Sequence, residues 1–294
     1  MLKKFNSFAF LFYFITSSLK EPVFGIDDDS ESRSLMKLHQ YSYRNIDKWY
    51  SINHRCSGGL QSPIDINMRQ TKKEIFPKFT RTNYFIKPLT TKITKGKFNL
   101  MVLPIYEQDY PILLGGPLEE PYRFNHVVFH WGKSDNLGSE HAINGKKFPL
   151  EIQAVHYNDN YDSYSEALNS PNGIAIVSYL FNINEKTTGD LALDLIQKPF
   201  EMLASVPTGE VELDYAFPIS LLTPPIYKRY VTYNGSLTLP PCSENVIWIV
   251  NYKPRSITML EMEKFRMLYN NSEGLINNFR PLQMTNQRDI YIVK

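Results

Sequence analysis

The sequence has no long block of like charges and little net charge. Its 32 basic and 30 acidic side chains leave a formal charge of +2 over 294 residues. A charge this small produces no field that gathers phosphate groups, so nucleic acid is not an expected partner. Hydrophobic residues make up 43% of the chain and charged residues 21%, a balance typical of a folded globular protein and not of a disordered one.

Long apolar runs are missing beyond the first residues. Lys3 and Lys4 precede an apolar run at 8–15 and small or polar residues at 16–18, the layout of a secretory signal peptide. The run is less than half of the roughly 20 residues that a membrane-spanning helix requires, which favours a cleaved signal over an anchor. No later stretch reaches spanning length, and residues 288–294 carry no lipid-anchor tail. We expect a signal peptide over residues 1–25, cleaved near 18 or 25, and a secreted, extracellular product without a membrane span.

Cysteine is scarce, with only Cys56 and Cys242 in the chain. In a secreted protein an even count favours a disulfide between them, the alternative being two buried thiols. Closing so long a loop would stabilise the fold by at most about 5 kcal/mol in the chain-entropy model. Asn234 and Asn270 each begin an Asn-X-Ser acceptor for N-glycosylation, and Asn270, just past an expected helix, is the better candidate.

Linkers, repeats and low-complexity breaks are absent after residues 26–34, an acidic, polar stretch that is expected to be flexible. The remainder, 35–294, is therefore predicted to form one domain. Strand-like runs rich in β-branched and aromatic residues recur at 98–106, 122–131, 150–157, 173–182, 245–252 and 289–293. Several are apolar on both alternating faces, as in central strands of a sheet that is covered on both sides.

Helical signals are fewer than strand signals. Thr258 and Glu261 form a capping box before a segment with apolar residues on one face. Another helix begins at 191–195, and Pro199 is expected to kink or restart it. Strands outnumber helices and do not alternate regularly with them. The fold class predicted is mixed α/β and sheet-dominated, not a doubly wound α/β fold.

The six histidines are the first candidates for metal or acid–base chemistry. Four of them lie between residues 126 and 156, in or beside the expected central strands. A buried imidazole is more often a hydrogen-bonded core residue than a metal ligand, so each is tested against that alternative. The six are His39, His54, His126, His130, His141 and His156.

The spacing of these histidines does not predict an intact zinc site. Neighbours at alternate positions of a strand share one face about 7 Å apart and can converge on one ion. His126 and His130 lie about 13 Å apart along the strand, too far to share a zinc ion, and the position between them is Val128. On the next strand Gln153 has the opposite orientation to His156, so His156 is not expected to complete a site.

Six ordered motifs resemble those of the α-class carbonic anhydrases, and they cover the chain from about residue 41 to its C-terminus. The resemblance implies one domain built around a large, twisted, mostly antiparallel ten-stranded β-sheet with short surface helices. It also implies a disulfide between Cys56 and Cys242, as in secreted members of the family. The motifs lie at residues 61–66 (QSPIDI), 129–132 (FHWG), 138–141 (GSEH), 154–158 (AVHYN), 235–242 (GSLTLPPC) and 278–281 (NFRP).

The family hydrates carbon dioxide with a zinc-bound hydroxide, and three histidines hold the metal. At those positions this sequence has Val128, His130 and Gln153. Valine has no lone pair, and a neutral amide is a weaker zinc ligand than imidazole. Zinc lowers the pKa of water from 15.7 to about 7, so its loss removes the nucleophile. We therefore expect no bound cofactor and no hydration of carbon dioxide at a family-like rate.

Much of the remaining site matches the family. Thr238 matches the threonine whose hydroxyl links zinc-bound hydroxide to a glutamate, here Glu140. His126 stands at a cavity-facing position where glutamine is usual, and Leu239 replaces a frequent threonine. No histidine occurs at 95–98, where fast members carry a proton shuttle. The apolar wall of the carbon dioxide pocket is matched by Val155, Ile176, Leu237, Val246 and Trp248, which also fit an ordinary core.

This pattern resembles the carbonic anhydrase-related proteins, which keep the fold and lose zinc ligands. Secreted members of that group act through protein–protein contacts or as matrix components. The predicted function is a non-catalytic extracellular binding or scaffold protein, whose apolar cavity suits a small apolar ligand. The alternative is a zinc-dependent carbonic anhydrase, a lyase, that holds its metal weakly through His130 and improvised ligands, or an enzyme with residual esterase-like activity.

Overall fold

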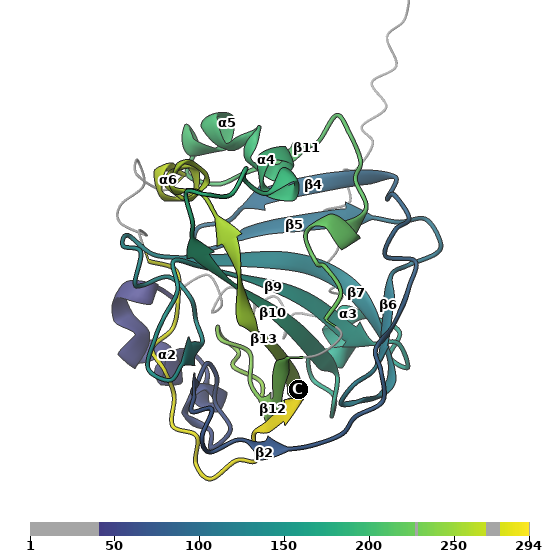
Figure 1. The fold of residues 1–294 in the computed structure, drawn as a ribbon, viewed down its shortest axis with the longest axis vertical. Helices are drawn as coiled ribbons and strands as arrows, with labels where there is room; N and C mark the ends of the chain where they lie inside the picture. Colours follow the sequence, from purple (N-terminus) through teal and green to yellow (C-terminus); the bar gives the residue numbers. More distant parts are fainter. Residues whose placement is uncertain (1–40, 227–228, 269–276, 294) are drawn as a thin grey trace, which may run out of the picture.

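A twisted β-sheet of twelve strands runs through the protein (Figure 1). The computed structural model describes residues 41–226, 229–268 and 277–293. Ten of the strands follow one hydrogen-bonded path. In spatial order they are β11 (Gly209–Glu212), β4 (Thr90–Lys95), β5 (Leu100–Ile105), β7 (Leu118–Trp131), β9 (Leu150–Asn158), β10 (Ile174–Ile183), β13 (Val246–Ile257), β12 (Tyr230–Gly235), β14 (Tyr291–Val293) and β2 (Lys72–Lys73).

Two further strands attach beside this path. β6 (Ile112–Gly115) pairs with β7, and β3 (Thr80–Thr82) pairs with β6. The β10/β13 and β14/β2 pairs are parallel, and the other pairs of the large sheet are antiparallel. A separate two-stranded sheet joins β1 (Asp65–Ile66) to β8 (Ala142–Ile143). The expectation of a large, mostly antiparallel sheet in a single domain is confirmed, although the sheet has twelve strands where the resemblance implies ten, because β3 and β6 attach beside the ten-stranded path.

The central strands are buried on both faces, as their apolar sequences predict. All nine residues of β9 and the first eight of β10 are buried. Because side chains alternate along a strand, each central strand contributes side chains to two core clusters, one on each face of the sheet. Ala154, aligned with Val177, lies in the first core cluster, and Val155, aligned with Ile176, lies in the second.

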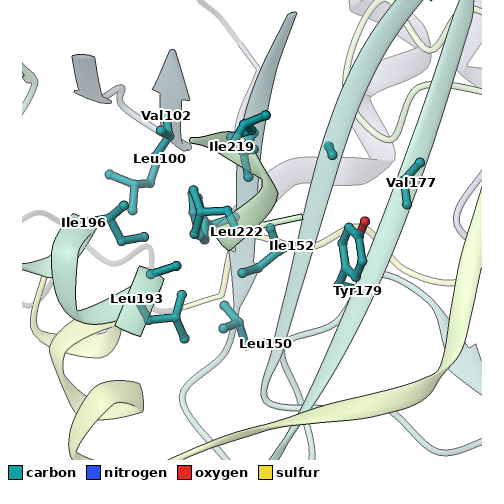
Figure 2. Close-up of a cluster of buried hydrophobic side chains, with 14 of the residues drawn as sticks. Leu100, Val102, Leu150, Ile152, Val177, Tyr179, Leu193, Ile196, Ile219 and Leu222 are labelled. Atoms are coloured by element: carbon teal, nitrogen blue, oxygen red, sulfur yellow. The ribbon is translucent and has the colours of Figure 1, made fainter. Parts of the chain in front are cut away.

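Helices cover the face of the sheet that carries the first core cluster. α4 (Leu191–Gln197) contributes Leu193 and Ile196, and the short helix η3 (Ile219–Leu221) contributes Ile219, to the same cluster as Ile152 and Tyr179 of the sheet (Figure 2). Burying such branched side chains contributes roughly 1.5–3 kcal/mol each. This packing fixes the strands whose opposite face carries the candidate site.

The predicted helix signals are confirmed. α6 (Met259–Met267) begins with the capping box, in which the Thr258 hydroxyl accepts from the Glu261 amide and the Glu261 carboxylate accepts from the Thr258 amide. α4 ends before Pro199, which is the N-cap of α5 (Phe200–Ala204). The remaining short helices are η1 (Tyr43–Lys48), α2 (Trp49–Ile52), η2 (His54–Ser57) and α3 (Tyr164–Ala167).

The first described segment is joined to later parts of the chain by a disulfide and by hydrogen bonds. The disulfide between Cys56 and Cys242 is present and spans 186 residues, which confirms the predicted pairing. The buried guanidinium of Arg280 donates to the carbonyl oxygens of Cys56 (3.0 Å) and Ser62 (2.8 Å) and to Oε1 of Gln61 (2.8 Å). Together these contacts tie residues 56–62 to the loop between β12 and β13 and to the segment around Arg280.

Several expectations concern residues outside the described ranges. These are the signal peptide at 1–25, the acidic segment at 26–34, His39 and the acceptor Asn270. None of the helices in the described residues combines the length and the apolar character that a membrane crossing requires.

Candidate metal centre

Strands β7 and β9 bring the three predicted ligand positions together on one face of the sheet. Val128 lies opposite Gln153, and His130 lies opposite Glu151. Since side chains two residues apart share a face, Val128, His130 and Gln153 are neighbours. The sheet therefore keeps the arrangement of positions that the resemblance implies.

His130 has one free ring nitrogen at this place. Its Nδ1 lies 2.8 Å from the carbonyl oxygen of Asn278 and, facing an acceptor, donates the hydrogen bond. In the neutral imidazole, Nε2 is then the atom with the lone pair. The ring is 1% exposed, and Nε2 has no hydrogen-bond partner among the described residues.

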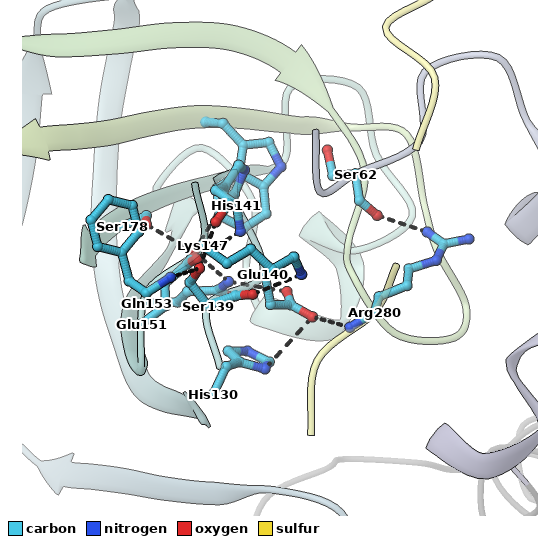
Figure 3. Close-up of polar contacts among 12 residues, drawn as sticks. Ser62, His130, Ser139, Glu140, His141, Lys147, Glu151, Gln153, Ser178 and Arg280 are labelled. Carbon is cyan, nitrogen blue, oxygen red and sulfur yellow. Dashed lines mark hydrogen bonds and ion pairs between the residues drawn. The ribbon is translucent and has the colours of Figure 1, made fainter. Parts of the chain in front are cut away.

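The side chain of Gln153 is turned towards two buried carboxylates. Its Nε2 donates to Oε2 of Glu140 at 3.1 Å and to Oε1 of Glu151 at 2.9 Å. Both hydrogens of the amide are used in these bonds, and a nitrogen that donates them has no lone pair for a metal. Figure 3 shows Gln153 between the two carboxylates.

Glu151 is held as a carboxylate by several donors. The Nδ1 of His141 and the hydroxyl of Ser178 both donate to its Oε1 at 2.8 Å, and the amide nitrogen of His141 donates to its Oε2 (Figure 3). Burial alone would raise the pKa of Glu151, but the attraction of His141 and its hydrogen bonds lower that pKa to about 2. Glu151 is therefore an anion over the whole physiological range.

Glu140 has a different environment from the one that the resemblance implies. Its Oε1 accepts from the backbone nitrogen of Arg280 at 3.0 Å and lies 3.6 Å from Nδ1 of His130. In the family the hydroxyl of the matching threonine donates to this glutamate. Within the described residues the side chain of buried Thr238 makes no hydrogen bond, and the donor to Oε2 is Gln153.

The predicted apolar wall lies around Val128. Val128 is 8% exposed and belongs to the second core cluster, against which Leu237 packs. Leu237 is only partly buried, so this apolar surface reaches the solvent, and Leu239 is partly buried as well. The cluster also contains the predicted wall residues Val155, Ile176, Val246 and Trp248.

His126 lies on the same strand face, but its ring contacts Asn125 and Tyr164. Its register partner is Val155, and its Nδ1 donates to Oδ1 of Asn125 at 2.6 Å. Its ring packs edge to face on Tyr164, with centroids 5.6 Å apart. Burial lowers the pKa of His126 to about 4, which keeps the ring neutral at physiological pH.

The residues at this site do not fit a zinc ion. Zinc sites in proteins use Cys, His, Asp or Glu, with at least three protein ligands. Of the three positions, only His130 offers an imidazole lone pair, since Val128 has none and Gln153, whose nitrogen donates to carboxylates, has only the oxygen of a neutral amide, which is a weaker zinc ligand. Across the described ranges, no group of three or more His, Cys, Asp or Glu side chains is placed to hold a metal ion.

Two histidines serve hydrogen-bond networks of the core. Nε2 of His141 lies 2.7 Å from the hydroxyl of Tyr233, which in turn lies 3.1 Å from that of Ser62. His156 points to the opposite face, as strand alternation predicts, and its Nε2 lies 2.6 Å from the hydroxyl of Tyr84. Sequence reasoning missed these tyrosine partners, because no spacing links residues 72 to 92 positions apart.

The described glycosylation acceptor lies on β12. Asn234 is exposed, whereas Ser236, the third residue of its motif, is fully buried and donates to the carbonyl of Leu237. The Ser236 hydroxyl also accepts from the backbone nitrogen of Ser62 at 2.9 Å. In the folded chain this hydroxyl is therefore enclosed.

The fold and this site define a carbonic anhydrase architecture, and comparison with known proteins gives the same answer. Residues 44–294 match the family model described as eukaryotic-type carbonic anhydrase. The chain belongs to this family.

Its curated relatives are similar over most of their length. "Carbonic anhydrase 3" of Mus musculus is 32% identical over 248 residues, covering 82% of this chain and 92% of the relative. "Carbonic anhydrase 7" of Mus musculus is 34% identical, covering 80% and 89%. "Carbonic anhydrase 1" of Monodelphis domestica is also 34% identical, covering 77% and 84%.

Proposed function

We propose that this member of the carbonic anhydrase family is a secreted protein with a broken zinc triad, catalytically inactive and acting as an extracellular binding or scaffold protein. The metal positions Val128 and Gln153 support the loss of catalysis, because neither side chain is placed to replace an imidazole ligand. In the carbonic anhydrases that the sequence resembles, zinc-bound hydroxide is the nucleophile. The pKa of water that is not bound to zinc is about nine units higher.

The single observation that carries this proposal is the double hydrogen bond from Nε2 of Gln153. Its amide contacts Glu140 and Glu151, two carboxylates that are 0% exposed. With its nitrogen held by these two carboxylates, Gln153 can offer a metal only the oxygen of a neutral amide, which binds zinc more weakly than an imidazole does.

Zinc analysis followed by hydration kinetics on one sample tests the proposal. Purified protein dialysed against equimolar zinc is expected to retain less than about a tenth of an equivalent, since a site with one imidazole forfeits most of the binding free energy. Stopped-flow measurements of carbon dioxide hydration are expected to match the buffer rate. Stoichiometric zinc together with fast, sulfonamide-inhibited hydration would overturn the assignment.

Secretion is part of the proposal and rests on the signal-like residues 1–25. The disulfide between Cys56 and Cys242 supports it, because such bonds persist in oxidising compartments. Expression in cultured animal cells, followed by mass spectrometry of the medium, is expected to yield a chain that begins after residue 18 or 25. Glycan mapping of the same sample tests Asn270 and Asn234. Retention of the uncleaved chain inside the cells contradicts this part.

The proposed partner is an extracellular protein or matrix component, as the resemblance to carbonic anhydrase-related proteins implies. A small apolar ligand is a second proposed occupant, at the surface around Val128, where partly buried Leu237 packs against the second core cluster. Methyl NMR of Val128 during titration with an uncharged aromatic probe tests this contact. If the Val128 methyl signals do not shift to a saturating value during the titration, the apolar ligand is rejected.

The alternative function is a zinc-dependent carbonic anhydrase with weak or unorthodox metal binding. The observation that favours it is the buried Nε2 of His130, which keeps a free lone pair. The same zinc measurement separates the two functions. An H130Q sample distinguishes a weak site at residue 130 from adventitious surface zinc, because only the former loses its metal.

A further inference from the structure

A second pocket lies behind the candidate metal centre, on the other face of the central strands. Its enclosed part has room for about one or two water molecules, and the rest of its roughly 300 Å³ of empty space is open to solvent. Ala154 and His156 of β9 line it, together with Val177 of β10 and Ile249 of β13. Val155 points to the opposite face, so the sheet separates the two sites.

An arginine without a carboxylate partner lines this pocket. One guanidinium nitrogen of Arg81, Nη2, donates to the carbonyl oxygen and to Oγ1 of Thr223, the latter at 3.1 Å. The guanidinium carbon lies 3.8 Å from the centre of the Tyr84 ring. Among the residues that the structure describes, no Asp or Glu comes within 4.0 Å of Arg81.

The other polar groups of the pocket do not neutralise this charge. Tyr84 and His156 are buried and lie against each other, with 2.6 Å between the hydroxyl and Nε2. Burial lowers the pKa of His156 to about 3, and the charge of Arg81 acts in the same direction. Nδ1 of His156, also buried, makes no hydrogen bond within the described chain. The pocket therefore holds one fixed positive charge beside neutral polar atoms.

We propose that this pocket binds a small monocarboxylate, with its carboxylate on the guanidinium of Arg81 and its short apolar part against Val177. A planar guanidinium offers donors whose spacing matches carboxylate oxygens. The apolar walls select against strongly hydrated inorganic ions. The enclosed part of the pocket is far smaller than a drug-sized ligand site and admits only a methyl-sized group, which restricts the ligand to the size of acetate.

Acetate titration at constant ionic strength, with chloride as the balancing anion, tests this site. The methyl NMR signals of Val177 and Ile249 are expected to shift and saturate, whereas those of Val128 on the opposite face stay constant. In R81Q the affinity is expected to fall at least about tenfold, because a charge-assisted hydrogen-bond pair is lost. R81K, which keeps the charge without the planar fork, is expected to bind with intermediate affinity.

Arg123 provides the matched control. It also stacks on a tyrosine, 4.5 Å from the Tyr110 ring centre, but it is already paired with Asp159 at 2.6 Å. R123Q is therefore expected to bind acetate as the unmodified protein does. Absence of saturable shifts up to about 100 mM acetate, a concentration above any useful affinity, overturns the site.

Two further outcomes also count against the proposal. Equal acetate affinity in R81Q and R123Q would remove Arg81 from the site. Equal shifts with chloride in place of acetate would reject a carboxylate ligand. None of these measurements depends on zinc or on hydration of carbon dioxide, so they leave the proposed loss of catalysis untouched.

Discussion

Nε2 of Gln153 donates a hydrogen bond of 3.1 Å to Oε2 of Glu140. The family resemblance implies that Glu140 accepts from the hydroxyl of Thr238 instead. The same nitrogen donates to Glu151. A glutamine amide has two N–H groups, and here each one serves a buried anion. The two carboxylates thus keep their donors without a metal ion.

The first prediction concerns the stability contribution of this amide. Q153L removes donors from two buried carboxylates, so we expect the free energy of unfolding to fall by roughly 2–5 kcal/mol. Urea unfolding followed by tryptophan fluorescence measures the change. Q197L is the matched control, because the buried amide of Gln197 donates to a backbone carbonyl, that of Glu261. Its loss is expected to be about 1 kcal/mol, and equal losses would contradict the special role of Gln153.

The second prediction is that two substitutions restore a zinc site. V128H together with Q153H places three imidazoles on adjacent positions of β7 and β9, as the register requires. We expect the double variant to bind about one equivalent of zinc and to gain thermal stability when zinc is added. V128H alone is the control and is expected to bind much less. If the double variant folds but binds no added zinc, the surrounding hydrogen bonds no longer orient the ligands.

The third prediction concerns acid sensitivity. The pKa values of His126 and His156 are lowered by burial to about 4 and about 3, whereas an unfolded histidine has a pKa near 6.5. Between these values the unfolded chain binds more protons, so stability falls as the pH is lowered from 6.5 towards 4. Two such groups give a slope of up to roughly 2–3 kcal/mol per pH unit.

Urea unfolding at a series of pH values tests this slope. Glu151, whose pKa is lowered to about 2, extends the loss of stability below pH 4.5. H156Q is expected to reduce the slope between pH 6.5 and 4, and H54Q, at an exposed position, is expected to leave it unchanged. A flat profile from pH 7 to 4 would contradict the buried neutral state of these rings.

The fourth prediction concerns the disulfide. Cys56 and Cys242 close a loop of 186 residues and pack with Trp49 in a small apolar cluster. Replacing both cysteines by alanine is expected to lower the free energy of unfolding by up to about 5 kcal/mol. The comparison is urea unfolding of the variant and of the unmodified protein with and without reductant. Equal stability in all three samples would mean that the unfolded chain is not constrained by this bond.

The central strands could be predicted from the sequence because their composition and burial agree. Residues 150–157 are apolar throughout, and β9 is buried throughout. Some strands near the end of the sheet were missed for the opposite reason. β4 has the sequence TTKITK, with an alternating burial pattern, and only Ile93 gives it an apolar signal. Its Lys95 is nevertheless buried, because Nζ donates to the carbonyl oxygens of Leu203 and Val206.

The candidate site was predictable in its positions but not in its bonding. Strand periodicity places Val128, His130 and Gln153 on faces that the structure brings together. The direction of the Gln153 amide depends on Glu140, which reaches the site through a loop between β7 and β9. No periodic pattern encodes that contact. The pocket at Arg81 was likewise hidden, because β3 has only three residues and no apolar alternation.

Arg280 sets an order for the assembly of the native chain. Its guanidinium binds groups of Cys56, Gln61 and Ser62, which precede it by 218 to 224 residues. The chain is synthesised from its N-terminus. The acceptor groups of these three residues therefore lack the Arg280 guanidinium until nearly all of the polypeptide has emerged from the ribosome. The segment synthesised among the earliest is thus among the last to be locked in place, and chains truncated before residue 280 are expected to leave it loose.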